Sequence, residues 1–381
     1  MGIIIKEVSN NRELKKFISF PYKLYAESKY WIPPLISEEK DILRKDKNPA
    51  FDFCKAKYWL AIKDGKVAGR IACIINPRFI EKWKKNYARF GWIDFIDDKN
   101  VSKALFDKME TWAKEMGMSA VHGPLGFTDL DPEGMLIEGF DELGTIATIY
   151  NYPYYPEHLK ECGYKKDTDW VEFEVKVPDK LPEKIERIAS IVKKKNKLYV
   201  LKATKKKDLI PYTKEIFYLI NEAYEPLYGV VHLTEKQIEK YIKQYFGMIL
   251  PDFVSIILDE QNKIAGFGIT MPSMSRAFQK AKGKLFPFGF FHILKALKKT
   301  TRVDMYLVAV RPDLQSKGVN AILFNEFFRV FVNKNIINTE TNPELETNNR
   351  VKSLWKFFEH RQHKRRRCYI KKLKKIKVGK N

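Results

Sequence analysis

One segment in the C-terminal half of the chain restricts the possible folds more than any other, because it runs from a strand through a short turn into a helix. The apolar run Val303 to Val310 predicts a strand, which Pro312 and Asp313 end. Ala321 to Val332 predicts a buried helix. The free N–H groups of a first helical turn attract anions, and Gly318 lets the backbone come close to one. The segment therefore predicts a phosphate site.

Two hairpins share a sequence pattern. Tyr58 to Pro77 and Phe253 to Ser273 each contain Lys-(Val/Ile)-Ala-Gly, and each places a polar turn between two apolar strands. The first turn is Asp64-Gly65, a dipeptide typical of two-residue hairpin loops, and the second covers residues 259–262. Because a strand, a helix and another strand follow each hairpin, the pattern predicts one domain in two tandem copies.

The chain length of 381 residues agrees with two domains that each have their own core. Hydrophobic residues make up 45% of the chain and aromatic residues 14%, as in globular proteins. We expect the boundary near Val177 to Lys184, where VPDKLPEK separates an apolar strand from an amphipathic helix. The predicted domains are therefore residues 1–178 and 179–381.

Targeting and cysteine patterns restrict the cellular setting. No run of about 20 apolar residues is present, and MGIIIKEVSNNRELKK becomes charged too early for a signal peptide. The four cysteines lack C-x-x-C spacing, so neither a disulfide framework nor a zinc site is indicated. We expect a cytoplasmic protein that contacts the inner face of the membrane peripherally.

The strand-turn-helix segment resembles the pyrophosphate loop of the GNAT superfamily of acyl-CoA-dependent N-acyltransferases. Gln315 and Gly318 match its Gln-x-x-Gly-x-(Gly or Ala) pattern, and Asn320 stands at the last small position. GNAT domains carry a hairpin just before the cofactor strand, as both halves do here. The resemblance covers most of the chain and implies an α/β (α+β) fold of two tandem GNAT-like domains, each a mixed central sheet flanked by helices.

The resemblance implies acyl-CoA as co-substrate, either acetyl-CoA or a long-chain acyl-CoA, and no metal. The pyrophosphate would lie on backbone amides of the loop, and the pantetheine arm along the preceding strand, in a gap where neighbouring strands diverge at a bulge. Family members also place Asn at the start of a later helix, here expected from Thr347 to Glu359. The implied cofactor-binding residues are Leu307, Val308, Val310, Gln315, Ser316, Lys317, Gly318, Val319, Asn320, Ala321 and Asn348.

The implied reaction is direct acyl transfer to an amine. The amine attacks as the free base, so a carboxylate must take its proton, and we expect Glu340, Glu344 or Glu138 to do so. A backbone N–H of the cofactor strand would stabilise the oxyanion. Where family members have a proton-donating tyrosine this chain has Trp355, which cannot titrate. Tyr306, a tyrosine of the first domain, or solvent would then protonate the thiolate.

The first domain lacks the loop. Its strand Phe90 to Phe95 continues through the acidic IDDKN directly into the helix Val101 to Lys114, so phosphate would be repelled and one cofactor is expected per chain. A later Gly/Pro-rich loop could instead form a wall of the amine-binding site. Its candidate acids are Asp129, Asp131, Glu133 and Glu138, and solvated turn acids are the alternative.

The net charge of +23 favours anionic partners. No acidic residue follows Glu359, and the basic C-terminus HRQHKRRRCYIKKLKKIKVGK could attract nucleic acid, an anionic membrane or the phosphates of coenzyme A. Its His360-x-x-His363 lacks further ligands at usable spacing, so we expect no metal there. The segment Leu285 to Lys299 carries aromatic residues and lysines. It predicts either contact with a membrane or an acyl chain, or an ordinary core helix. Nucleic acid is the less favoured partner of the protein.

These features predict an acyl-CoA-dependent N-acyltransferase that transfers an acetyl or longer acyl group to a primary amine. The inserted aromatic segment and the charge look similar to those of bacterial ceramide synthases, which join a long acyl-CoA to a sphingoid base. The alternatives are a catalytically inactive protein, an aminoacyl-tRNA-using tandem GNAT protein, or an RNA-binding module. The sequence leaves the acceptor, the acyl length and the oligomeric state open.

Overall fold

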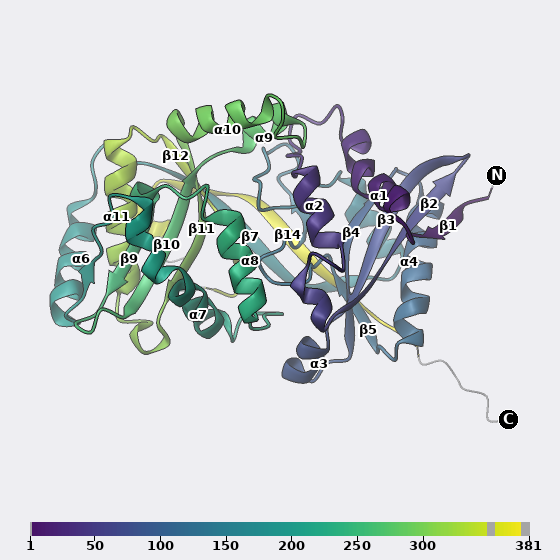
Figure 1. Ribbon diagram of the computed structural model, residues 1–381, viewed down its shortest axis with the longest axis horizontal. Helices are drawn as coiled ribbons and strands as arrows, with labels where there is room; N and C mark the ends of the chain where they lie inside the picture. Colours follow the sequence, from purple (N-terminus) through teal and green to yellow (C-terminus); the bar gives the residue numbers. More distant parts are fainter. Residues whose placement is uncertain (1, 349–354, 375–381) are drawn as a thin grey trace. The chain divides into compact units, whose positions relative to one another are not determined.

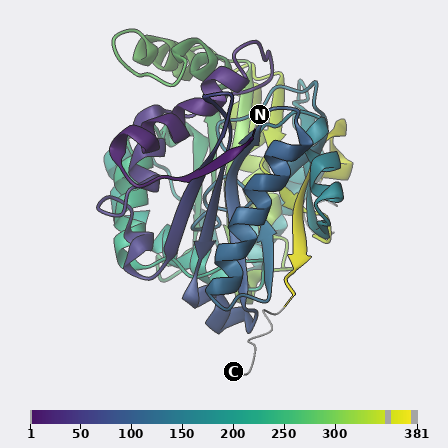
Figure 2. The ribbon, with the colours of Figure 1, turned by 90° about the vertical axis from the view of Figure 1, so that its right-hand side faces the viewer.

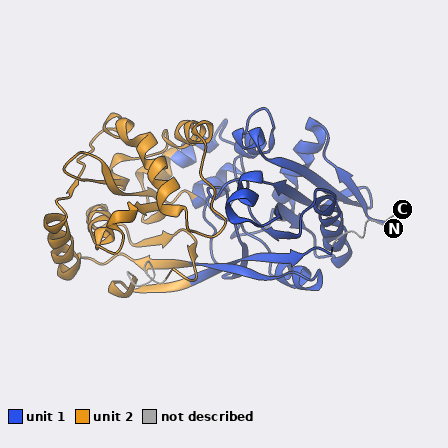
Figure 3. Ribbon diagram, turned by 90° about the horizontal axis from the view of Figure 1, so that it is seen from below, with its two compact units in different colours: residues 1–171, 275–293, 363–381 blue, residues 172–274, 294–362 orange. Residues whose placement is uncertain are grey.

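The computed structural model describes residues 2–348 and 355–374 (Figure 1). Contacts divide the chain into two compact units, and each unit combines segments that lie far apart in the sequence (Figure 3). The first unit contains residues 1–171, 275–293 and 363–381, and the second contains 172–274 and 294–362. The predicted division at residues 178 and 179 assumes two domains that follow one another along the sequence. It stays a prediction, because each folded unit contains segments from both sides of that division.

The first unit is a mixed sheet covered by helices. Its strands are ordered β1-β2-β3-β4-β5-β14, with β6 beside β14, and only β4 and β5 are parallel among the pairs with a described register. The strands are β1 Ile4–Glu7, β2 Lys55–Lys63, β3 Lys66–Ile75, β4 Tyr87–Phe95, β5 Ala120–Gly123, β6 Met135–Glu138 and β14 His360–Lys372. The helices are α1 Asn11–Leu24, α2 Ile36–Leu43, α3 Pro77–Trp83, α4 Lys99–Glu115, α5 Tyr154–Glu161, α9 Ser275–Ala281 and α10 Gly289–Lys298, which crosses into the second unit, with one 3-10 turn at Pro49–Asp52.

Side-chain alternation places helices on both faces of this sheet. Tyr58 and Leu60 of β2 pack in one cluster with Phe17 of α1, whereas Trp59 and Ala61 pack in another with residues of α4. Figure 2 shows α1 and α4 on opposite sides of the strands. The α/β fold is therefore built by apolar residues on both faces of each central strand.

The second unit repeats this arrangement around β11. Its strands are ordered β7-β12-β11-β10-β9-β8, and β11 and β12 form its parallel pair. The strands are β7 Lys165–Lys176, which begins in the first unit, β8 Tyr199–Val200, β9 Val254–Leu258, β10 Ile264–Pro272, β11 Arg302–Val310, β12 Asn338–Thr341 and β13 Glu344–Leu345. The helices are α6 Glu183–Lys195, α7 Thr213–Tyr224, α8 Glu235–Tyr245 and α11 Val319–Asn333, with 3-10 turns at Lys206–Tyr212, Pro251–Phe253, Pro312–Leu314 and Trp355–Phe357.

A glycine of β10, two residues beyond the shared Ala-Gly, has a packing role in the second unit. A Cβ on Gly268 would lie 2.1 Å from the ring of Phe327 of α11, so this glycine lets the helix lie close against the sheet. The predicted strand 303–310, the helix 321–332 and both hairpins are confirmed.

The basic C-terminus, for which the sequence indicated anionic partners and no secondary structure, is mostly a strand. Residues 360–372 form β14, whose part from His363 onward pairs with β5 and β6 in the first unit. Lys364 and Arg366 are buried there, and Arg367 forms an ion pair with the buried Asp169 at 2.8 Å. Residues 375–381 lie outside the described residues. Most of this charge is therefore used inside the unit.

Two further predictions meet the structure in part. Within the expected helix Thr347 to Glu359, residues 349–354 lie outside the described part, and Trp355–Phe357 form a single 3-10 turn. In the segment Leu285 to Lys299, α10 begins at Gly289 and several aromatic side chains are exposed, so it is not an ordinary core helix. No helix within the described residues is both long and apolar enough to cross a membrane.

Candidate acyl-CoA site

A bulge opens one edge of β11 in the second unit. Leu307 lies opposite Ile269 of β10 and Met305 lies opposite Thr270, so Tyr306 is an extra residue without a cross-strand partner on β10. On the other side, the pairing of β11 with β12 covers Arg302 to Met305 and stops there in the part of the chain that the structure describes. The edge of β11 beyond Met305 is therefore open, as the sequence-based reading of a gap at a bulge requires.

Three carbonyl oxygens show which backbone groups face this edge. The oxygen of Tyr306 accepts a hydrogen bond from Nδ2 of Asn342 at 2.8 Å, and that of Val308 accepts one from the hydroxyl of Tyr224 at 3.0 Å. The oxygen of Val310 accepts one from Nε2 of Gln315 at 3.2 Å. In a strand, the N–H of a residue points to the same side as its carbonyl. The N–H groups of Val308 and Val310 therefore face the open edge, where a pantetheine arm could pair. The N–H of Tyr306 does not, because the other end of its peptide unit, the carbonyl of Met305, faces this edge and accepts the N–H of Asn342 at 3.1 Å.

Leu307 plays a different part. The backbone N–H and carbonyl of Leu307 point to the side opposite to those of the next residue, so they face β10. Its side chain packs against the apolar cluster that contains Phe267. Val308 and Val310 are thus placed to pair with an extended ligand, whereas Leu307 supports the strand from behind.

The loop after β11 presents unprotected backbone amides. Ser316 and Gly318 adopt left-handed conformations, with φ of 65° and 84°, and α11 begins at Val319. Gly318 is the N-cap and no side chain caps the helix, while Ala321 donates its N–H to the oxygen of Gly318 at 2.9 Å. The N–H groups of Val319 and Asn320 lack intrahelical acceptors, as at every helix start. Such a turn is a suitable cradle for a pyrophosphate.

The remaining residues hold the loop in shape. Arg311 forms ion pairs at 2.7 Å with Asp259 and with Asp313, and these contacts raise its pKa. Gln315 uses its side chain to bond the end of β11, so it positions the loop and does not project into it. A Cβ on Gly318 would lie 2.9 Å from Cγ2 of Val192 on α6, so both its φ and this contact require glycine.

The corresponding position in the first unit already holds an anion. The side chain of Asp98 caps α4 by accepting the N–H of Asn100 at 2.9 Å. Lys63 lies 2.5 Å from Asp98, and its hydrogen bond lowers the pKa of that carboxyl. A charged aspartate therefore occupies the helix N-terminus that a phosphate would need.

The gap beside β4 is also filled. Pairing of β4 with β5 reaches Arg89, and just beyond it Leu125 donates its N–H to the oxygen of Phe90 at 2.8 Å. A Cβ on Gly91 would lie 2.5 Å from the oxygen of Leu125. Further along, Phe95 donates its N–H to the hydroxyl of Tyr155 at 3.1 Å. The chain's own groups thus take the place that a cofactor would occupy.

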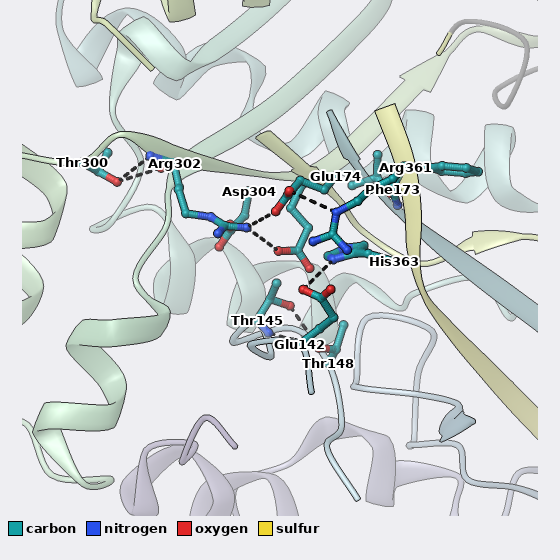
Figure 4. A network of polar contacts seen from close by, with 12 residues as sticks. Glu142, Thr145, Thr148, Phe173, Glu174, Thr300, Arg302, Asp304, Arg361 and His363 are labelled. Atoms are coloured by element: carbon teal, nitrogen blue, oxygen red, sulfur yellow. Dashed lines mark hydrogen bonds and ion pairs between the residues drawn. The ribbon is translucent and has the colours of Figure 1, made fainter. Parts of the chain in front are cut away.

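Of the four predicted catalytic residues, Tyr306 and Glu340 lie on neighbouring strands. Burial, and then the charge of Asp304, raises the pKa of Tyr306 well above its usual value, so its hydroxyl is protonated at neutral pH. Glu340 is 5% exposed and lies opposite Asp304 in the pairing of β12 with β11. Arg302 lies 3.8 Å from Glu340 and 2.7 Å from Glu174, which also accepts a bond from Arg361 (Figure 4).

Glu344 and Glu138 have structural partners. Nε1 of Trp355 lies 3.2 Å and 3.4 Å from the two carboxylate oxygens of Glu344, so the tryptophan orients this acid. Glu138 belongs to the first unit, where Arg365 lies 3.2 Å from it. Asn348 donates its N–H to the oxygen of Leu345 at 2.8 Å, and residues 349–354, which follow it, lie outside the described residues. Its cofactor role remains a prediction.

The acidic loop of the first unit is largely committed to its own fold. Asp131 accepts the backbone N–H groups of Phe127 and Thr128 at 2.8 Å and 3.0 Å. Burial, and then the charge of Asp129, raises the pKa of Glu133 well above its usual value. These contacts are those of a closed turn, and the proposed role as a wall of the amine site stays a prediction.

Three possible metal ligands also meet in the first unit. His122, Asp167 and Cys368 place their ligand atoms within 4.8 Å of one another. Burial lowers the pKa of His122 to about 4, with further lowering by the positive charges of Arg89 and Lys85, which would also repel a metal cation. We therefore assign no metal role to this cluster. Its members come from three strands, so no sequence spacing could have indicated it.

Tyr224 and Asn342 were not anticipated. Both donate hydrogen bonds to the open edge of β11, and burial raises the pKa of Tyr224 to about 12. Asn342 follows directly after β12, a position where polar residues often carry function, so a signal existed. Tyr224 ends α7, and the sequence on either side of it gave no such signal.

Comparisons with known proteins agree with this geometry. No protein-family model matches the chain. It is 30% identical over 379 residues to protein YghO of Escherichia coli strain K12, covering 97% of this chain and 95% of that protein. It is 28% identical over 322 residues to a bacterial ceramide synthase of Caulobacter vibrioides, covering 82% of each. A tandem GNAT protein from the clavulanic acid biosynthesis pathway superposes with a TM-score of 0.54 at 11% identity, covering 98% of this chain and 99% of that one.

Proposed function

Because the chain belongs to the family of protein YghO and has the fold of tandem GNAT proteins, we propose that it transfers an acyl group from acyl-CoA to the nitrogen of a primary amine. One observation carries the proposal. In the second unit, the open edge of β11 is followed directly by the N-terminus of α11, which no side chain caps. The strand edge can pair with a pantetheine arm, and the helix start next to it can bind a pyrophosphate.

The residues of the second unit have distinct roles in this reaction. The N–H group of Val308, which faces the open edge, is placed to polarise the thioester carbonyl and hold the developing oxyanion. The amine nitrogen forms a bond to the carbonyl carbon, and the C–S bond then breaks. The amine proton passes to a carboxylate, Glu340 or Glu344, and the departing thiolate takes a proton from Tyr306. No covalent enzyme intermediate is required.

For the acceptor we propose a lipid amine of the sphingoid-base type, with a long-chain acyl-CoA as donor. The 28% identity to a bacterial ceramide synthase over most of both chains supports this choice. The exposed aromatic side chains of residues 285–299 support it independently, since an amphiphilic acceptor must be taken from a membrane or micelle. An RNA-binding or aminoacyl-tRNA function is less favoured, because the basic residues of β14 are largely buried or paired.

The reaction is tested by incubating the protein with acyl-CoA species of different length and following thiol release with and without amines. We expect release that depends on both a long-chain acyl-CoA and a sphingoid base, with the amide identified by mass spectrometry. Release without any amine, or no release with any amine in the panel, would refute N-acyl transfer.

Titration calorimetry should find one acyl-CoA site per chain. In the first unit, Asp98 and Leu125 occupy the anion position and the strand gap. Removing the carboxylate by Asp98→Asn should therefore leave the stoichiometry at one, while a negative charge introduced into the loop of residues 315–321 should weaken binding at that one site. Two occupied sites per chain would contradict the assignment.

Replacing Tyr306 by Phe should lower kcat by roughly ten- to a hundredfold, the size of a general-acid contribution, with little change in acyl-CoA affinity. Tyr224→Phe is the matched comparison, because it removes the other tyrosine hydroxyl at the same edge. If Tyr306 is the acid, Tyr224→Phe changes kcat much less. The opposite ranking would transfer the role to Tyr224, whose pKa of about 12 is also suitable for a donor.

A further inference from the structure

The segment between β10 and β11 folds onto the first unit as a firmly held element. Ile36 donates its N–H to the oxygen of Gly283 at 3.0 Å, and Nε2 of Gln279 donates to the oxygens of Lys29 and Trp31 at 3.0 Å each. Gly283 is buried with φ of 76°, and a Cβ there would lie 2.4 Å from the ring of Tyr22. These contacts give residues 275–293 a fixed inner face.

The outer face of this element is strongly apolar. Ala277, Phe278 and Ile293 are buried against the unit, whereas Phe286 is 76% exposed and Phe288 is 70% exposed. These are the two most exposed large apolar side chains in the part of the chain that the structure describes. Phe291, on the first turn of α10, is 57% exposed. When an element buries one set of apolar residues and exposes another, the exposed set indicates an interaction surface.

The charge around the exposed phenylalanines has one sign. No acidic residue occurs between Ser275 and Lys299. Exposed basic residues precede and follow the aromatic group along the chain: Arg276, Lys280, Lys282, Lys284, Lys295, Lys298 and Lys299. An apolar tip with a basic rim matches the acyl region and the anionic headgroups of a lipid bilayer.

We propose that Phe286, Phe288 and Phe291 insert into the surface of an anionic bilayer while the surrounding lysines bind its headgroups. The inference rests on the proposed function in that it gives the acceptor lipid a route to the enzyme. A bilayer fits better than nucleic acid, because the basic residues flank the aromatic ones and do not alternate with them as in a stacking platform. Contact through both apolar and charged groups makes binding only partly sensitive to salt.

Vesicle co-sedimentation tests the proposal. The full chain should bind phosphatidylcholine vesicles that contain phosphatidylserine, and some binding should persist at about 1 M salt, where charges are screened beyond about 3 Å. The triple change Phe286→Ser, Phe288→Ser and Phe291→Ser should lower binding by at least about tenfold at both low and high salt, because it removes apolar burial. Changing Lys280, Lys282 and Lys284 to Gln should reduce binding mainly at low salt.

A matched control removes as many exposed apolar side chains elsewhere. Ile4→Ser, Ile210→Ser and Ile337→Ser alter positions that are 66%, 55% and 56% exposed, and they should leave vesicle binding unchanged. A single Phe286→Trp change gives a second readout that spares the fold. Its fluorescence should shift to the blue with vesicles and be quenched by lipids brominated in their acyl chains.

Three results would overturn the proposal. The first is vesicle binding that salt abolishes completely. The second is an equal loss of vesicle binding in the phenylalanine and isoleucine triple variants, and the third is an unchanged fluorescence spectrum of the Phe286→Trp variant on addition of vesicles. Tighter binding to an RNA oligonucleotide than to vesicles would assign the basic rim to nucleic acid. Acyl-CoA affinity, measured on the same variants, keeps the two proposals apart, since failed vesicle binding with intact acyl-CoA binding refutes only the membrane contact.

Discussion

Replacing Ser316 by Asp should weaken acyl-CoA binding by roughly ten- to a hundredfold, whereas Asn at the same position should leave it nearly unchanged. Ser316 is exposed and has φ of 65°, a conformation that Asp and Asn both tolerate. The two variants therefore differ in charge and hardly in strain. A carboxylate beside the bound pyrophosphate would cost about 1–3 kcal/mol by repulsion in this partly solvated loop.

Calorimetry with a non-hydrolysable acyl-CoA analogue measures this difference directly. Equal affinities for the Asp and Asn variants would mean that the pyrophosphate lies elsewhere. Gly318→Glu, the more obvious change, tests the site less cleanly. It forces a side chain into φ of 84° and toward Val192 on α6, so lost binding could follow from a displaced α11 as well as from charge.

Replacing Asp169 by Asn should destabilise the protein by about 2–4 kcal/mol, because it removes a buried counter-ion that Arg365 and Arg367 of β14 share. The carboxylate of Asp169 is 1% exposed and lies 2.8 Å from Arg367, 3.2 Å from Lys166 and 3.3 Å from Arg365. The three partners keep partial contact with water, which places the expected cost below that of a fully buried pair. Asn keeps the size of the side chain and removes its charge.

The same site predicts a pH dependence. Burial alone would raise the pKa of Asp169, but the hydrogen bond and charge of Arg367 outweigh it and lower the pKa below the ordinary 3.8. The folded state therefore binds this proton less readily than the unfolded state does. The stabilisation is present in full above the ordinary pKa and is lost as the pH falls through that value toward the lower folded pKa.

Denaturant unfolding at neutral pH and at acid pH measures both effects. The difference in unfolding free energy between wild type and Asp169→Asn should shrink as the pH falls below the ordinary aspartate pKa. Asp107→Asn is the matched control, since Asp107 pairs with Lys103 on the exposed surface of α4 and should contribute little. Equal effects of the two substitutions would show that β14 is not held by Asp169.

Local patterns predicted the strand, loop and helix of the proposed cofactor site. The strand at 303–310, the loop with Gly318 and the helix that follows depend on apolar spacing, on a proline and on one glycine, all within a short stretch of chain. Such signals act between near neighbours, so they can be read without knowing the fold. The same reasoning recognised IDDKN as hostile to phosphate, and the structure adds that Asp98 itself caps the helix.

The strand in the basic segment 360–372 could not be predicted, for the opposite reason. A run of Lys and Arg with no nearby acid looks solvated, but Asp169 neutralises part of it from nearly two hundred residues away in the sequence. Lys371 likewise pairs with Glu110 at 2.7 Å. Strand pairing between distant segments leaves no periodic trace in either one, so charge composition alone could not reveal it.

Local sequence patterns were sufficient to predict two halves that each begin with a hairpin, one helix start suited to an anion and one helix start preceded by acidic residues. The open edge of β11 required the folded structure, because it depends on where pairing with β12 stops, at Met305. The fold also places the hydroxyl of Tyr224 at that edge and leaves Phe286, Phe288 and Phe291 exposed. Propensity and turn chemistry act locally, whereas an open strand edge or an exposed face is set by what packs beside it from elsewhere in the chain.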